Sequence, residues 1–120
     1  MDDTRIRVEI EPSGPGETIL RLSGDIDVFA DDTLAKAYAE AARDGATRLV
    51  LDFTLVGYIN STGIALIVRL LAEARRDRRE VVAVGLSEHY REIFRITRLS
   101  DYLTIVDAPA PAGSLEEASR

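Results

Sequence analysis

Cysteine is absent from the sequence, and lysine and histidine occur once each, as Lys36 and His89. Without cysteine the chain has no disulfide framework, no thiolate nucleophile and no cysteine-ligated metal site. His89 lies among charged residues with no second metal ligand placed beside it, so we interpret it as an exposed helix residue. Terminal solvation and helix capping explain the acidic pairs Asp2-Asp3 and Asp31-Asp32. We therefore expect no metal and no other cofactor.

Basic charge is also in short supply, because 15 Lys and Arg against 21 Asp and Glu leave a formal net charge of −6. This acidic field would repel a polyanion, so we expect no direct contact with nucleic acid. The longest uncharged run, 53–68, contains glycine, asparagine and hydroxyl residues, unlike a membrane span. Met1-Asp2-Asp3 is acidic where a secretory signal would be basic. These features predict a cytoplasmic protein without a membrane contact.

The motifs of several enzyme classes are missing. No glycine-rich loop ends in Lys-Ser or Lys-Thr, so there is no P-loop, and no serine has the flanking glycines of a nucleophile elbow. A receiver domain would need a lysine near the end of its last strand, whereas Lys36 falls in the first predicted helix. We therefore expect a protein that is not an enzyme and has no catalytic residues of its own.

The chain length and its punctuation predict one domain. A chain of 120 residues and 13.2 kDa can bury one core. We expect this domain to span 1–108, followed by a Pro/Ala-rich tail, 109–120, with at most a short helix.

The amino-terminal third has the pattern of a hairpin followed by a helix. Charged and apolar residues alternate over 5–10, and Pro12–Gly16 predicts a turn into a second strand at 18–22. We expect a further turn at 24–27, and then a helix that is capped by Asp31 or Asp32 and ends at Gly45.

The rest of the chain alternates strands and helices. Apolar runs at 49–51 and 81–84 predict strands covered on both faces, and a last strand is predicted at 103–106. One helix is predicted from Ser61 to the charged segment 75–79, and another after Ser87. Right-handed crossovers then give an α/β fold with a mixed, mostly parallel sheet of about five strands, an N-terminal hairpin and three to four helices packed against it.

Functional sites in such folds gather at the carboxyl ends of strands, which draws attention to the loop predicted between Asp52 and Ser61. Asn60, Ser61 and Thr62 place an amide and two hydroxyls at the start of an apolar helix, and Gly63 allows another backbone to come close. Helix capping by Asn60 or Ser61 explains this segment. The alternative is a modified hydroxyl, because a phosphate there would be stabilised by helix N–H groups, and its charge of about −1.5 to −2 could expel an acidic partner.

The order of these motifs resembles the STAS domain, the sulfate-transporter and anti-sigma-factor-antagonist family, and more narrowly its free-standing anti-sigma factor antagonists. The resemblance covers about Ile6 to Val106. It rests on Leu51-Asp52 and on 60–64 at the start of the helix, with support from 22–27 and 84–87.

The resemblance implies a reversible switch at Ser61, the position of the family's phosphate acceptor, with Thr62 as a second acceptor in some members. Its partner would be a serine kinase that is itself the anti-sigma factor, so that phosphorylation controls sigma-factor-dependent transcription and a serine phosphatase resets the cycle. The kinase-binding surface would include Asp27, Asp25, Asn60 and Gly63, on a monomer or weak homodimer. The alternatives are a STAS scaffold subunit of a stress-sensing complex, or an accessory or nucleotide-binding module of a transporter system.

The sequence departs from the family pattern in three places. Asn60 stands where the family usually has aspartate, and Arg78 and Arg98 stand where glycine is common at helix ends. We also expect the family's long terminal helix to be shortened here by the proline-containing segment.

Overall fold

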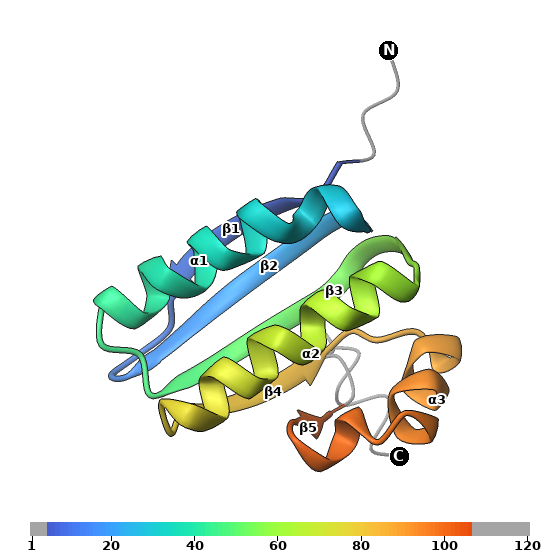
Figure 1. The fold of residues 1–120 in the computed structure, drawn as a ribbon. Helices are drawn as coiled ribbons and strands as arrows, with labels where there is room; N and C mark the ends of the chain where they lie inside the picture. Colours follow the sequence, from blue (N-terminus) through green and yellow to red (C-terminus); the bar gives the residue numbers. More distant parts are fainter. Residues whose placement is uncertain (1–4, 107–120) are drawn as a thin grey trace, which may run out of the picture.

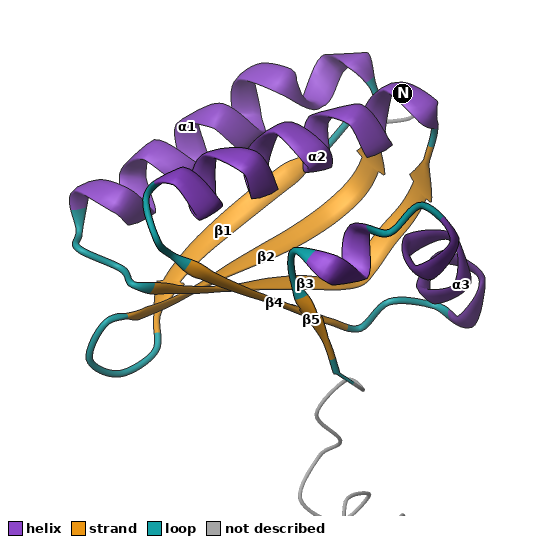
Figure 2. Ribbon diagram, turned by 60° about the horizontal axis from the view of Figure 1, so that its bottom comes forward, coloured by secondary structure: helices purple, strands orange, loops and turns teal. Residues whose placement is uncertain are grey.

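The computed structural model describes residues 5–106, which form one sheet with two long helices on one of its faces (Figures 1 and 2). The strands lie in the spatial order β1 (Arg7–Pro12), β2 (Glu17–Ile26), β3 (Arg48–Ile59), β4 (Glu80–Val84) and β5 (Thr104–Ile105). The helices are α1 (Asp31–Arg43), α2 (Ser61–Arg76) and α3 (Glu88–Ile96), with short 3-10 turns η1 (Val28–Ala30) and η2 (Leu99–Asp101). Only the β1–β2 pair is antiparallel within this sheet. The predicted α/β fold with an N-terminal hairpin is confirmed, whereas the tail predicted at 109–120 lies outside the described residues.

Strand β2 is longer than its sequence pattern predicts. We expected a turn at 24–27, but the strand continues through Gly24 and Asp25 and pairs with β3 as far as Ile26 and Ile59. Two register shifts accommodate this extension, and Gly24 beside one of them has a φ of 94°. Glycine tolerates this backbone conformation, so the ladder continues past residues whose composition favours a turn.

Strand β3 also exceeds its prediction. It runs to Ile59, so the loop expected between Asp52 and Ser61 shrinks to Asn60 alone. Its pairing with β2 supplies backbone partners along this length. The prediction that 49–51 is covered on both faces is wrong, because Val50 is only half-buried on the face opposite the helices. It is correct for β4, where 81–84 is buried throughout.

A charged cluster lies on the sheet face opposite α1 and α2. The Arg21 guanidinium donates hydrogen bonds to Glu11 at 2.6 and 2.9 Å and to Asp52 at 3.5 Å. The bond to Glu11 and its charge, together with the charge of Asp52, raise the pKa of Arg21 above its ordinary value. Asp52 also accepts from the backbone N–H and the hydroxyl of Thr54 at 2.9 and 2.6 Å. Asp52 thus takes part in hydrogen bonds on this face of the sheet and does not lie at the end of β3, which is Ile59.

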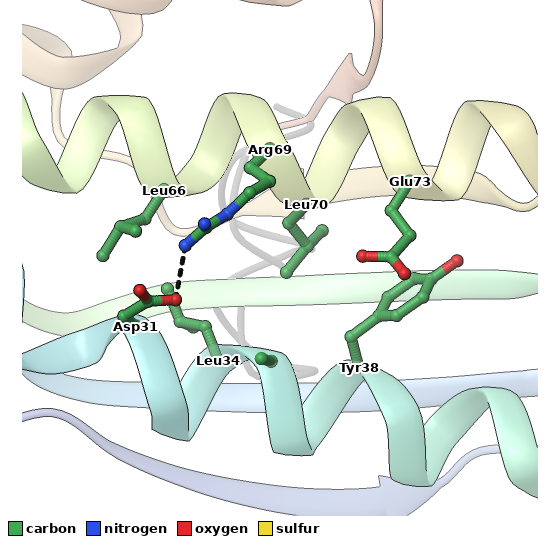
Figure 3. Close-up of a pocket in the computed structure, with 8 residues that line it drawn as sticks. Asp31, Leu34, Tyr38, Leu66, Arg69, Leu70 and Glu73 are labelled. Carbon is green, nitrogen blue, oxygen red and sulfur yellow. Dashed lines mark hydrogen bonds and ion pairs between the residues drawn. The ribbon is translucent and has the colours of Figure 1, made fainter.

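Helices α1 and α2 pack against each other along their length (Figure 3). Leu34 from α1 and Leu66 and Leu70 from α2 line the space between them, and Arg69 makes an ion pair with Asp31 at its rim. The remaining cavity is about 30 Å³, roughly the volume of one water molecule. This interface therefore fixes the position of α2 and offers no room for a ligand.

Helix α1 begins differently from its prediction. Asp27 caps the preceding turn η1, because its carboxylate accepts from the backbone N–H of Phe29 at 3.0 Å. Ala30 is the N-cap residue of α1, and no side chain within residues 5–106 caps this helix. Asp31 and Asp32 lie in the first turn instead, where their negative charge interacts favourably with the positive end of the helix dipole. Gly45 has a φ of 83°, as expected for a residue that ends a helix.

Helix α3 lies beyond the carboxyl end of β4 (Figure 1). Ser87 caps it as predicted, accepting from the backbone N–H of Tyr90 at 3.2 Å. Phe94 meets Phe53 of β3 edge to face, with ring centroids 5.8 Å apart. This contact packs α3 against the middle of β3.

Candidate functional site

The candidate site is built where the carboxyl ends of β2 and β3 meet the amino end of α2. Ile26 and Ile59 form the last pair of the two strands, and the backbone N–H of Asn60 donates to the carbonyl of Ile26 at 3.3 Å. Asp27 follows Ile26 and Ser61 follows Asn60, so each lies next to one of the two residues that this bond joins. Tertiary pairing therefore brings together two motifs that are far apart in the sequence.

Asn60 is the residue that caps α2. Its backbone is extended, and its side-chain oxygen accepts from the N–H of Gly63 at 2.8 Å. Of the two residues that the sequence offered as caps, Asn60 is therefore the cap and Ser61 is not. Ser61 and Thr62 are exposed, and within residues 5–106 their hydroxyls make no hydrogen bond. The two hydroxyls therefore face solvent at the start of the helix.

Gly63 is required by a close approach between α2 and β2. A Cβ at this position would lie 2.0 Å from the carbonyl oxygen of Ile26 and 2.7 Å from its carbon. Both distances are below any real contact, and the neighbour is backbone, which cannot rotate away. The expectation that Gly63 allows another backbone to come close is confirmed, and this contact sets the depth at which the start of α2 lies.

The two predicted acidic residues lie along the same edge of the sheet. Asp25 pairs in register with Tyr58, and its carboxylate lies 3.1 Å from where a Cβ of Gly57 would be. Asp27 is held by its bond to the N–H of Phe29. The structure thus brings all of the predicted site residues to one edge: Asp25, Asp27, Asn60, Ser61, Thr62 and Gly63.

The sequence patterns did not reveal an apolar surface at this edge. Val28, Phe29 and Tyr58, which we call the apolar rim, are 59%, 66% and 57% exposed. The Arg5 guanidinium lies 5.6 Å from the centre of the Phe29 ring. The only signal was the place of Val28 and Phe29, directly before a helix and outside its apolar face. Contiguous patches of exposed apolar side chains mark protein-binding surfaces, so these three residues are candidate contacts for a partner.

The sequence patterns assigned no role to the hydroxyl of Tyr90 in α3, which contacts the end of β3. It accepts from the backbone N–H of Ile59 at 2.9 Å and lies 3.5 Å from the Ile59 carbonyl. No local sequence pattern could reveal this bond, because Tyr90 and Ile59 are 31 residues apart in the sequence and meet only in the folded chain.

His89 is an exposed residue of α3, as predicted. Among residues 5–106, no three His, Asp or Glu side chains gather as a metal site would require. Within the same part of the chain, no helix is both long and apolar enough to span a lipid bilayer.

Comparison with known proteins gives a consistent result. The family model described as "Mlab, STAS domain" matches residues 11–107. The anti-sigma-B factor antagonist of Listeria monocytogenes is 29% identical over 100 residues, which cover 83% of this chain and 88% of that protein.

Solved structures share the fold at lower sequence identity. An anti-sigma factor antagonist from Mycobacterium paratuberculosis matches with a TM-score of 0.72 and 18% identity, over 99% of this chain and 98% of that one. The Bacillus cell fate determinant SpoIIAA in its phosphorylated form matches with a TM-score of 0.67 and 17% identity, over 95% and 100%. The family model spans most of the chain, from residue 11 to residue 107, so this chain belongs to the STAS domain family.

Proposed function

We propose that this chain is an anti-sigma factor antagonist that binds an anti-sigma factor serine kinase and is released when the kinase phosphorylates Ser61. The observation that carries the proposal is the hydroxyl of Ser61 at the first position of α2, which is exposed and makes no hydrogen bond within residues 5–106. The exposed side chains of the apolar rim lie at the same end of the sheet. The names of the relatives support the antagonist role, and one neighbouring structure is of a phosphorylated form. A cytoplasmic serine phosphatase would reset the switch.

The capping of α2 supports Ser61 as the acceptor. Because Asn60 binds the N–H of Gly63, the hydroxyl of Ser61 is not needed as a cap and can be modified without breaking the helix. A phosphate on Ser61 would lie at the positive end of the helix dipole, near the N–H groups of the first turn. Thr62 is the alternative acceptor, since it is also exposed.

The transfer needs no catalytic group from this chain. The oxygen of Ser61 attacks the γ-phosphorus of ATP bound to the kinase, an oxygen–phosphorus bond forms, and the bond to the ADP leaving group breaks. The hydroxyl proton passes to a base on the kinase. This is consistent with a chain that carries a positioned hydroxyl and leaves the chemistry to its partner.

The charges and the apolar rim explain why phosphorylation would release the kinase. A complex that buries Val28, Phe29 and Tyr58 removes water from the neighbouring Ser61 as well. A neutral hydroxyl tolerates this, whereas a phosphate adds a charge of about −1.5 to −2 that is costly to desolvate. Asp25 and Asp27 lie at the same edge and add like-charge repulsion on a chain that already carries −6.

The test is phosphorylation of the chain by its cognate kinase and ATP, followed by mapping of the phosphate by mass spectrometry. We expect modification at Ser61, and loss of most of it in Ser61→Ala. Modification confined to residues other than Ser61 and Thr62 would overturn the site.

A binding measurement tests the charge mechanism separately. Ser61→Asp should weaken binding to the kinase by about tenfold or more, whereas Ser100→Asp adds the same charge at η2 and should leave binding unchanged. Equal affinities for Ser61→Asp and the wild-type chain would contradict the mechanism.

A further inference from the structure

The end of β3 lacks a strand neighbour on one side within the described sheet. Its pairing with β4 ends at Asp52 and Val84, while its pairing with β2 continues to Ile59. Beyond Asp52, backbone groups that point away from β2 need another partner, because a buried N–H left without one is costly. Ile59 is buried, so this requirement applies to it in full.

The hydroxyl of Tyr90 meets this requirement at Ile59. It accepts from the Ile59 N–H at 2.9 Å and faces the Ile59 carbonyl at 3.5 Å, so both backbone groups of this residue point toward α3. Tyr90 is itself fixed, because its own N–H donates to the capping oxygen of Ser87 at 3.2 Å. The bond therefore connects two ordered elements, the start of α3 and the end of β3.

Three consecutive anchors then lead to Ser61. Ile59 is held by Tyr90, the N–H of Asn60 is held by the carbonyl of Ile26 at 3.3 Å, and the side chain of Asn60 holds Gly63 at 2.8 Å. Ser61 lies between the second and third anchors, and its hydroxyl makes no hydrogen bond among the described residues. Its position is set by its neighbours.

We propose that Tyr90 is a positioning residue that holds the β3 end, and through it Ser61, in the geometry needed for phosphate transfer. This inference rests on the proposed function of Ser61. Tyr90 contacts no reacting atom and acts only through Ile59. The role of Tyr90 makes α3 a part of the switch. Helix α3 contains no proposed acceptor, and the rest of α2 and β4 lie between it and Ser61 in the sequence.

A small cavity beside Tyr90 makes it possible to test positioning apart from stability. A space of about 90 Å³ lies between the end of β3 and the start of α3, lined by residues that include Val56, Ile59 and Tyr90. It is large enough for water. If the hydroxyl is removed, a water molecule can take over the bond to Ile59, but it cannot hold Ile59 at a fixed distance from α3. Position is then lost while stability changes little.

The experiment compares Tyr90→Phe with Tyr38→Phe in the full chain. The control also removes one hydroxyl, which donates to Asp77 at 2.7 Å near the opposite end of α2. With the cognate kinase and ATP, we expect Tyr90→Phe to lower kcat about tenfold with KM within about twofold, since a shift of about 1 Å can cost up to about 100-fold in rate. Tyr38→Phe should leave both values unchanged. Equal kcat values for Tyr90→Phe and the wild-type chain would overturn the proposal.

Amide hydrogen exchange provides a readout that does not need the kinase. In Tyr90→Phe, the amides of Ile59 and Gly63 should exchange about tenfold faster than the change in global stability accounts for, and those of α1 should not. If they remain as protected as in Tyr38→Phe, Tyr90 does not position this segment. If the wild-type chain is not phosphorylated at Ser61, the proposed function fails, and the exchange measurement still decides the role of Tyr90.

Discussion

The α-carbon of Gly63 lies against the backbone carbonyl of Ile26, so closely that a Cβ would come within 2.0 Å of its oxygen. This contact joins the start of α2 to the end of β2 and thereby brings Asp27 beside Ser61. The geometry of the candidate site thus depends on the absence of a single side chain.

Replacement of Gly63 by alanine should destabilise the protein despite alanine's better helix propensity. Alanine would gain about 1 kcal/mol in a free helix, but overpacking against rigid backbone costs about 1–3 kcal/mol, and the severity of this clash puts the cost at the upper end. We expect a net loss of about 2 kcal/mol in the free energy of unfolding, measured in urea. Gly57→Ala is the matched control, because its Cβ would meet only the carboxylate tip of Asp25 at 3.1 Å. A stability gain for Gly63→Ala would contradict the contact.

Asn60→Asp should affect the two forms of the switch in opposite directions. In the unphosphorylated chain, aspartate keeps the cap and adds a negative charge at the helix start, which should gain about 0.5 kcal/mol. In the Ser61-phosphorylated chain, repulsion between the carboxylate and the phosphate should cost about 1 kcal/mol.

Urea unfolding of both forms tests this prediction. Asn60→Ala serves as the control, since it removes the cap and should lower the stability of both forms by about 1 kcal/mol. A shift of equal size and sign in both forms of Asn60→Asp would show that the carboxylate and the phosphate do not interact.

Arg78→Gly should stabilise the chain although it removes a side chain. Arg78 and Arg98 have φ values of 60° and 67°, a conformation that costs a non-glycine residue about 1 kcal/mol or more. Part of this gain is offset by the freedom of glycine in the unfolded chain, so we expect about 0.5 kcal/mol for either replacement. Arg76→Gly, inside the last turn of α2, should instead lose about 0.5–1 kcal/mol. Equal effects of Arg78→Gly and Arg76→Gly on urea unfolding would contradict this interpretation.

The stability of the chain should fall at alkaline pH in a way that depends on Tyr38. Burial first, and then the hydrogen bond to Asp77, raise the pKa of Tyr38 above its ordinary value of 10.0. The folded state therefore retains a proton that the unfolded state loses, so this contribution is complete below pH 10 and is lost as the pH rises toward the folded-state pKa.

Tyr38→Phe should accordingly flatten the dependence of stability on pH above about 10, measured as the free energy of unfolding in urea. Tyr102→Phe, at a tyrosine that is half exposed, is the control for the removal of a hydroxyl. Identical slopes for Tyr38→Phe and the wild-type chain would show that Tyr38 titrates alike in both states.

The local patterns predicted the elements but not their ends. Alternation in β1 and helical spacing after Ser61 are properties of neighbouring residues, so the hairpin and α2 could be found from the sequence. The extents of β2 and β3 could not, because Gly24 pairs with Val56 across the two strands, and Gly57 lies at the register shift between this pair and the pair Asp25–Tyr58. The same pairing reduced the expected loop between Asp52 and Ser61 to one residue.

The sequence by itself determined the polar segment at the start of α2, the glycine within it, the acidic net charge and the absence of known catalytic motifs. Only the tertiary structure decided that Asn60 and not Ser61 is the cap, that Val28 and Phe29 remain exposed beside it, and that Tyr90 reaches the backbone of Ile59. The physical reason is that helix propensity and alternation act over a few residues. Caps, exposed surfaces and backbone bonds between elements depend on which distant strand or helix arrives beside them.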